Sequence, residues 1–222
     1  SCVSLQEGAR RITVQDCAFL DPVSRITGAR RYSFNVSGQL CLVQRCYARG
    51  GRHDFVMHSR ARGPNAFVDC VADRTYCASG PHHRWATGTL YDNVSCEELY
   101  VRWRDDWGSG HGWPGANTVF WNCRADHVIC QKPPTAQNWC VGCTGHIRGN
   151  GRIRSSGEPV SPRSLYLEQL EDRLGAQAVR NVTTERQRRG HGQTAEISTP
   201  PERGVPKSYN TLDVFLRKKL SR

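Results

Sequence analysis

One pattern recurs along the first two thirds of this chain: a short run of apolar and β-branched residues mixed with polar ones, closed by a cysteine. The runs read RITVQDC, LCLVQRC, PNAFVDC, LYDNVSC, TVFWNC and NWCVGC, and they end at Cys17, Cys46, Cys70, Cys96, Cys123 and Cys143. These cysteines are 29, 24, 26, 27 and 20 residues apart. A unit of about two dozen residues at such spacing predicts a solenoid of parallel β-coils, in which each coil covers its neighbours.

Long polar insertions separate the later runs, at residues 47–65, 72–88, 97–117 and 124–138. Their glycine, proline, asparagine and histidine content predicts loops or short strands. Loops carried on a rigid scaffold are where function usually lies. We therefore expect the cysteine runs to provide the architecture and the insertions to provide the site.

The repeat is lost after residue 151, where a helix is predicted. Ser161 is its expected N-cap, Pro162 its first helical residue and Gly175 its end, with leucines at 165, 167, 170 and 174. We expect this helix to cover the open end of the solenoid, whose last coil otherwise exposes strand edges. The predicted organisation is β-coils over 1–150, a capping-helix segment over 151–180 and a polar, mobile tail over 181–222.

Eleven cysteines do not fit a complete disulfide framework, because the number is odd. Equivalent positions in stacked parallel coils lie about 4.8 Å apart, which suits a column of buried thiols acting as small apolar side chains. We favour this column over disulfides, and the sequence leaves both open.

The net charge of +11 is carried almost wholly by arginine, and residues 151–222 supply +6 of it. Because the polar C-terminal third holds more than half of the charge, the distribution argues against nucleic acid as a partner. An acidic polysaccharide is equally compatible with the charge. No apolar run in the sequence is long enough to cross a membrane.

Alignment of the coils on their closing cysteines places basic residues in one column. Twelve positions before Cys70, Cys96, Cys123 and Cys143 stand His58, Arg84, His111 and Gln131. His82, His83 and Lys132 lie within two positions of this column. Successive coils are then expected to present these side chains as a cationic groove, with a step of about 4.8 Å per coil.

Two sets of residues resemble those of bacterial proteins in the pectin-lyase-like superfamily. They are the stacked positions Phe67, Asn93, Phe120 and Asn122, and the motifs HHRWATGTLYDN and GSGHGWPGANTVFWNC. The resemblance covers about residues 1–150 and includes no pectate lyase catalytic signature. It implies an all-β fold, a right-handed parallel β-helix, in a secreted or periplasmic protein. It also implies cleavage of a polysaccharide lying along the coils, by β-elimination or hydrolysis.

β-Elimination on a uronic-acid polymer needs a cation to neutralise the carboxylate and a base to remove the adjacent proton. Arg84 and Lys132 are the candidates for the cation. His83 and His111 are the candidates for the base. A structural role in the loops is the alternative for each histidine.

Hydrolysis needs two carboxyl groups, and the nearest supply is Asp105 and Asp106, whose side chains point apart on an extended backbone. Further carboxyl groups are those of Asp54, Asp73 and Asp92. For either reaction, the candidate substrate-binding residues are His58, His82, Trp85, Trp107, Trp113 and Asn117, with Trp103 as a further apolar platform.

Metal chemistry is not predicted. Cys140 and Cys143 form a Cys-x-x-Cys pair, but no second pair accompanies it and Cys143 belongs to the cysteine column. No cofactor is predicted, although Ca²⁺ is compatible with scattered aspartates. The leading hypothesis is a carbohydrate-active enzyme that acts on an acidic polysaccharide, with elimination slightly favoured. A glycoside hydrolase and a non-catalytic, glycan-binding β-helix module are the alternatives, and the oligomeric state is left open.

Overall fold

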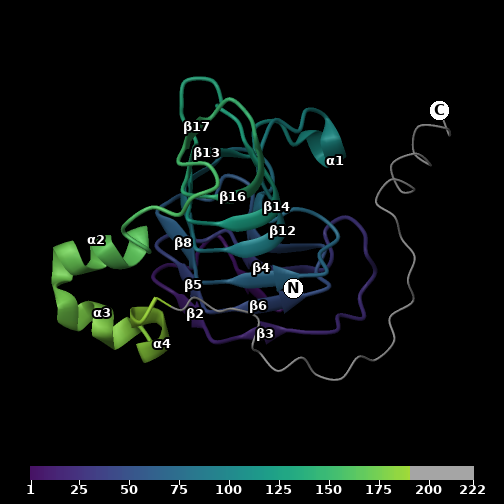
Figure 1. The fold of residues 1–222 in the computed structure, drawn as a ribbon. Coiled ribbons are helices and arrows are strands. Elements are labelled where there is room, and N and C mark those ends of the chain that lie inside the picture. Colours follow the sequence, from purple (N-terminus) through teal and green to yellow (C-terminus); the bar gives the residue numbers. More distant parts are fainter. Residues whose placement is uncertain (191–222) are drawn as a thin grey trace, which may run out of the picture.

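Figure 1 shows the computed structural model of the chain, which describes residues 1–190. This part is mostly β, and each of its strand pairs is parallel. The strands form three sheets, which the chain visits repeatedly along its length. The prediction of a parallel β fold is confirmed.

The first sheet has four strands, in the order β1 (Val3–Leu5), β4 (Tyr32–Val36), β7 (His53–Met57) and β10 (Gly80–Pro81). The second has seven, in the order β17 (Arg152–Arg154), β15 (Trp139–Val141), β13 (Gly115–Trp121), β11 (Ala86–Asp92), β8 (Asn65–Val68), β5 (Leu42–Gln44) and β2 (Thr13–Gln15). The third has six, in the order β16 (Thr144–Arg148), β14 (Arg124–Cys130), β12 (Ser95–Val101), β9 (Val71–Asp73), β6 (Tyr47–Arg49) and β3 (Ala18–Phe19). Because β17 pairs with β15, the paired strands continue past the predicted boundary at residue 150.

A single residue makes each corner between the second and the third sheet. Its backbone is left-handed in every coil, with φ between 50° and 67°, at Asp16, Arg45, Asp69, Asn93, Asn122 and Gly142. Asparagine, aspartate and glycine adopt this conformation more readily than other residues, and they make five of the six corners, whereas Arg45 makes the other. A polar residue or glycine before the cysteine therefore marks this corner in the sequence.

The residue after each corner lies in the core and forms a column. Cysteine occupies it at Cys17, Cys46, Cys70, Cys123 and Cys143, and all eleven cysteines of the chain are free thiols. In the remaining coil the column residue is Val94, because Asn93 makes the corner and the Val94 carbonyl accepts the N–H of Arg124 at 2.9 Å. The prediction that Cys96 belongs to the column is wrong by two residues, since Cys96 pairs in register with Ala125.

An aromatic column fills the core beside the thiols. Tyr91 pairs in register with Phe67 on one side and Phe120 on the other. Its ring centroid lies 4.9 Å from that of Phe67 and 5.5 Å from that of Phe120, and all three side chains are fully buried. Burial of each such side chain stabilises the fold by roughly 1.5–3 kcal/mol. The predicted equivalence of Phe67 and Phe120 is confirmed, as is that of Asn93 and Asn122, which both make corners.

Three helices follow the last strand: α2 (Leu165–Leu174), α3 (Ala176–Val182) and α4 (Glu185–Arg188). The predicted helix is present and ends before Gly175. It begins later than predicted, because Ser164 is the N-cap and its hydroxyl accepts the N–H of Leu167 at 3.2 Å. Ser161 and Pro162 therefore precede the helix.

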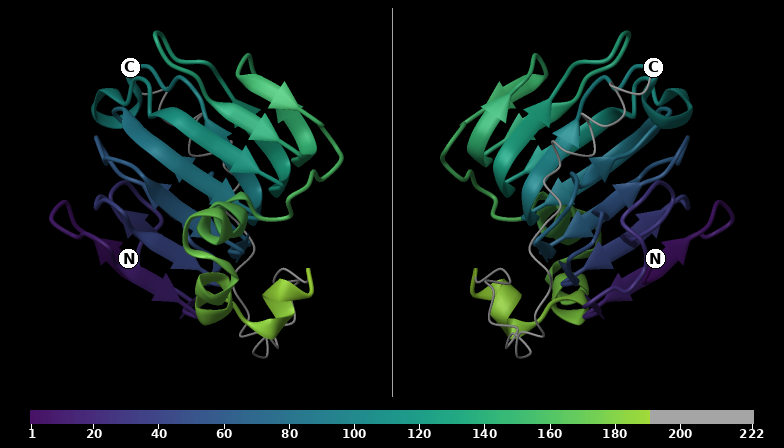
Figure 2. Two further views of the ribbon diagram at one scale, coloured as in Figure 1. Left: turned by 90° about the vertical axis from the view of Figure 1, so that its left-hand side faces the viewer. Right: turned by 90° about the vertical axis from the view of Figure 1, so that its right-hand side faces the viewer.

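The helices lie beside the strands and not over an end of the stack, as Figures 1 and 2 show. Tyr166 packs against Leu42, Ala66 and Val68, which form a small apolar cluster on the second sheet. The prediction that this segment caps the open end is wrong. The physical reason is that the corners and their neighbours present hydrogen-bonding side chains along this side of the stack.

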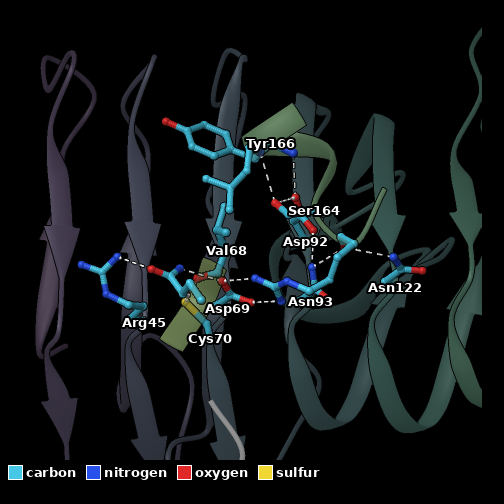
Figure 3. A network of polar contacts seen from close by, with 12 residues as sticks. Arg45, Val68, Asp69, Cys70, Asp92, Asn93, Asn122, Ser164 and Tyr166 are labelled. Atoms are coloured by element: carbon cyan, nitrogen blue, oxygen red, sulfur yellow. Dashed lines mark hydrogen bonds and ion pairs between the residues drawn. The ribbon is translucent and has the colours of Figure 1, made fainter. Parts of the chain in front are cut away.

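Two aspartates at these corners hold the helical segment (Figure 3). Asp69 is buried and accepts both terminal guanidinium nitrogens of Arg163, at 2.8 and 2.9 Å, and the amide of Gln187 at 2.7 Å. Asp92 accepts the Ser164 hydroxyl and the backbone N–H of Tyr166, each at 2.7 Å. The segment is thus tied to successive coils through charge-assisted hydrogen bonds.

The predicted tail begins inside this packed segment. Helix α4 falls within residues 181–190, and its Gln187 is buried. The rest of the predicted tail, 191–222, lies outside the described residues. No helix found in residues 1–190 has the length and apolar character needed to span a membrane.

Candidate active site

Five histidines from neighbouring coils lie in ring contact, and we call them the histidine cluster. They are His53, His58, His82, His83 and His111. Ring centroids are 4.4 Å apart for His53 and His82, 4.6 Å for His58 and His83, 5.0 Å for His82 and His111, and 5.1 Å for His83 with either His82 or His111. The cluster is therefore one continuous group of rings.

Parallel strand pairing brings these histidines together. Pro81 of β10 lies beside Met57 of β7, and the N–H of His82 donates to the Met57 carbonyl at 2.9 Å. One coil further on, the N–H of Arg84 donates to the carbonyl of His111 at 3.0 Å. The structure thus gathers five of the predicted site residues, His58, His82, His83, Arg84 and His111.

His82 is held on both ring nitrogens. Arg104 donates from Nη1 to the His82 carbonyl at 2.6 Å and lies 3.0 Å from its Nδ1. Because a guanidinium only donates, Nδ1 accepts and Nε2 carries the proton, 3.3 Å from the Tyr32 hydroxyl. His53 places Nδ1 2.7 Å from the Ala78 carbonyl, so this nitrogen donates and its buried Nε2 is an acceptor without a partner.

Burial keeps the cluster uncharged. It lowers the pKa of His53 to about 3, and it lowers the pKa values of His83 and His111 to about 4. The positive charge of Arg84 and Arg104 acts in the same direction on His83 and His111. These imidazoles are therefore free bases at neutral pH, and the buried Nδ1 atoms of His83 and His111 have no hydrogen-bond partner.

Arg84 supplies a positive charge next to these bases. Its Nη2 donates to the Ser109 carbonyl at 2.5 Å and to the Ser109 hydroxyl at 2.7 Å. Ser109 lies in the short helix α1 (Trp107–Gly110), so this contact joins the third insertion to the coil before it. After burial, the charge of Arg84 is the other cause that lowers the pKa of His58.

Tryptophans from the same insertions are partly exposed. Trp85 and Trp107 expose 39% and 38% of their surface, and Trp103 exposes 47%, which is enough for ring faces to meet a ligand. The rings of Trp103 and Trp113 lie 5.5 Å apart, and the backbone N–H of Trp85 donates to the Trp113 carbonyl at 2.7 Å. Three of these tryptophans are thus linked beside His111.

Two other predicted positions do not join the cluster. Lys132 is exposed, and its backbone N–H donates to Asn150 at 2.9 Å. Asn117 is also exposed and donates its N–H to the Gln137 carbonyl at 2.8 Å, as a left-handed residue within β13. No hydrogen bond or ion pair in the described structure connects the side chain of Lys132 or Asn117 to a histidine of the cluster.

The predicted carboxyl groups are dispersed. Asp105 and Asp106 are exposed before α1, and within residues 1–190 their carboxylates form no ion pair. Asp54 is buried and accepts the hydroxyl of Ser33, Asp73 accepts that of Tyr47 at 2.6 Å, and Asp92 binds the helical segment. Burial raises the pKa of Asp54 to about 7. Each of these buried or half-buried aspartates has a different partner.

Sequence reasoning missed the inner part of the cluster: Tyr32, Arg52, His53 and Arg104. Tyr32 and His53 pair in register at the start of β4 and β7. In the sequence, a polar or amphipathic residue at the first position of each of these apolar strands could have indicated them. Arg104 reaches His82 only because the third insertion folds back, and no periodicity indicates that contact.

A hollow of about 550 Å³ lies between β14 and β16 on the third sheet. It is lined by residues that include Arg124, Asp126, His127, Thr144 and His146. The rings of His127 and His146 lie 5.9 Å apart there. Neither here nor elsewhere in residues 1–190 do three or more His, Cys, Asp or Glu side chains form a group that could hold a metal ion.

Comparison of the chain with family models, with curated proteins and with solved structures yields no match. The residues of the site are therefore the basis of the functional argument.

Proposed function

We propose that this protein is a carbohydrate-active enzyme that cleaves an acidic, uronate-containing polysaccharide by β-elimination. One observation supports this most strongly: uncharged histidines with free ring nitrogens lie beside the guanidinium of Arg84. Elimination needs that combination of a base and a cation.

In the proposed reaction Arg84 pairs with the carboxylate of the sugar unit and stabilises the charge that develops on it. His83 or His111 acts as the base and removes the proton from the carbon next to the carboxylate. Because the Nδ1 atoms of both rings are buried, the nitrogen that takes the proton is Nε2, or Nδ1 after the ring turns toward the substrate. The electron pair of that C–H bond forms a double bond within the ring, and the glycosidic C–O bond breaks. The departing oxygen takes a proton from water, and the hydroxide that remains takes the proton held by the histidine, which restores the base. The products are one unsaturated end and one new hydroxyl end.

Hydrolysis receives less support, because it needs two carboxyl groups that face one substrate. The aspartates considered for it are divided between an exposed loop and separate buried partners. A glycan-binding module without catalysis would use the same exposed tryptophans, so it remains an outcome of the test.

We further propose that the three parallel sheets close into a right-handed parallel β-helix of the pectin-lyase-like kind, in a secreted or periplasmic protein. Two features support this arrangement. The chain passes from sheet to sheet in a repeating order, and crossovers between parallel strands are right-handed in nearly all proteins. The substrate would lie across the coils at the histidine cluster.

Digestion of uronate polymers tests the function. We expect the ultraviolet absorbance of unsaturated uronate ends to grow together with the number of new chain ends. New reducing ends without that absorbance would establish hydrolysis and contradict the proposal. Retention of the polymer on immobilised protein without any cleavage would establish a binding module and contradict it as well.

A further inference from the structure

Within residues 1–190, the positive charge at the inner end of the histidine cluster has no ion-pair partner. Arg104 is partly buried, and burial together with the charges of Arg102 and Arg52 lowers its pKa to about 10. The ion pairs in the described structure join other arginines to their partners, and none involves Arg52, Arg102 or Arg104. Like charges gathered without an acid are costly unless a ligand compensates for them.

Arg52 carries the sharpest sign of a missing partner. Its Nη1 is buried and forms no hydrogen bond. Its guanidinium lies 6.0 Å from the centre of the Tyr32 ring. A buried charged donor left unpaired costs on the order of 1–3 kcal/mol or more. The residue as a whole is only half-buried, so a ligand at its exposed edge needs a small rotation of the guanidinium to reach Nη1.

Arg52 and Arg84 adjoin opposite ends of the cluster, because Arg52 precedes His53, Arg84 follows His83, and the His82 ring lies between those two rings. After burial, the charge of Arg84 lowers the pKa of His58 and that of Arg52 lowers the pKa of His53, and both charges act on His111. Arg104 lies between them, because it is bonded to His82. Two cationic positions are therefore separated by the rings that supply the base.

We propose that Arg52 and Arg104 form a second anion subsite, which binds the carboxylate of the sugar unit next to the one that meets Arg84. A guanidinium binds a carboxylate through two parallel hydrogen bonds, and two guanidiniums compensate a carboxylate fully. The substrate class is then a polymer with carboxylates on successive units, as opposed to one that alternates uronate with neutral sugar. This inference rests on the proposed function.

The test compares Arg52→Gln with wild-type protein on polygalacturonate and on the same polymer with most carboxylates methyl-esterified. Losing one charge-assisted contact should raise KM for the free-acid polymer about tenfold and leave kcat nearly unchanged. KM for the esterified polymer should hardly move. Arg60→Gln is the matched control, because Arg60 is exposed in the insertion that carries His58 and should leave both values unchanged.

Folding and function are separated by two additions. Arg52→Lys keeps the charge but loses the two parallel hydrogen bonds, so its affinity should lie between those of wild type and Arg52→Gln. Thermal unfolding of each variant shows whether it is folded. Calorimetric titration with a short oligogalacturonate measures binding without any cleavage. If no polymer is cleaved, the proposed function fails, and loss of oligogalacturonate binding in Arg52→Gln would still support the subsite.

Either of two results would overturn the inference. The first is a folded Arg52→Gln variant that binds oligogalacturonate as tightly as wild type. The second is Arg52-dependent binding of inorganic sulfate that does not compete with oligogalacturonate, which would make the position a site for a free anion and not for a sugar carboxylate.

Discussion

Arg163 and Arg52 are both partly buried arginines, but the side-chain nitrogens of Arg163 are paired with a carboxylate and Nη1 of Arg52 is unpaired. Arg163 gives both terminal nitrogens to the buried carboxylate of Asp69, which also binds Gln187. Arg52 keeps Nη1 buried without a partner, next to histidines whose nitrogens are also unpaired. Complete pairing fits a structural joint, whereas incomplete pairing fits a site that awaits a ligand.

The largest expected effect is a loss of activity when the histidine cluster is changed. His111→Ala should reduce kcat/KM for a uronate polymer about 10²- to 10⁴-fold, because it removes a candidate base. The measurement is the rate of unsaturated-end formation, with unfolding followed in parallel. His127→Ala changes a histidine of the hollow between β14 and β16, outside the histidine cluster, and should retain activity. A fully active His111→Ala enzyme would remove this residue from the reaction.

The next largest effect is a loss of stability when the attachment of the helical segment to the coils is removed. Asp69→Ala leaves Arg163 without its carboxylate and should lower the free energy of unfolding by about 3–5 kcal/mol. Urea unfolding measures this change, and the activity per folded molecule should be preserved. Asp106→Ala removes an exposed carboxylate and should leave the urea midpoint unchanged. Equal midpoints for the two variants would contradict the structural assignment of Asp69.

Asp54 combines both situations in one side chain, because one of its carboxyl oxygens is hydrogen-bonded and the other is not. Its Oδ1 accepts the Ser33 hydroxyl and its buried Oδ2 has no partner. Since folding raises the pKa of Asp54 to about 7, its protonated form stabilises the fold, and this contribution is lost as pH rises from about 4 through 7.

Asp54→Asn removes that pH dependence. The variant should be more stable than wild type at pH 8, by about 2–4 kcal/mol, and nearly equal to it at pH 4. Thermal or urea unfolding at both pH values measures the difference. A stability difference that does not change with pH would show that Asp54 titrates in the same range in the folded and unfolded chain.

The smallest effect is expected in the cysteine column, which belongs to neither region. Val94→Cys completes the column and should change the free energy of unfolding by less than about 1.5 kcal/mol, because the two side chains are similar in size and both apolar. Urea unfolding measures it. A larger loss would mean that Val94 does not occupy the position equivalent to Cys70 and Cys123.

The sequence repeat predicted the site better than it predicted its own register. Twelve residues before Val94 stands His82, and twelve before Cys70 and Cys123 stand His58 and His111. The alignment on Cys96 placed Arg84 between His58 and His111. When Val94 is used in place of Cys96, His82 takes that position and three histidines align. The order in which the strands pair was predictable from the nearly regular spacing of the cysteines, although the corner residue itself varies among aspartate, arginine, asparagine and glycine.

Contacts made by folded-back segments were not predictable in this way. Arg104 reaches His82 through an insertion whose path no periodicity records. The helix after the coils was recognisable from its leucines and Gly175, but its position was not. Apolar spacing shows that a helix has a face to bury, whereas the side of the stack that receives it is decided by Asp69 and Asp92.

The attachment of the helical segment also fixes the number of coils between its anchoring points. It accepts hydrogen bonds from Asn122 at Val160 and from Arg45 at Val182, so its anchoring points run back across the stack. If one complete coil between these corners were deleted, the remaining strands could still pair. The corner side chains on the two sides of the deletion would then be too close together to reach both Val160 and Val182. We therefore expect that adding or removing a coil between Arg45 and Asn122 requires a matching change in the helical segment.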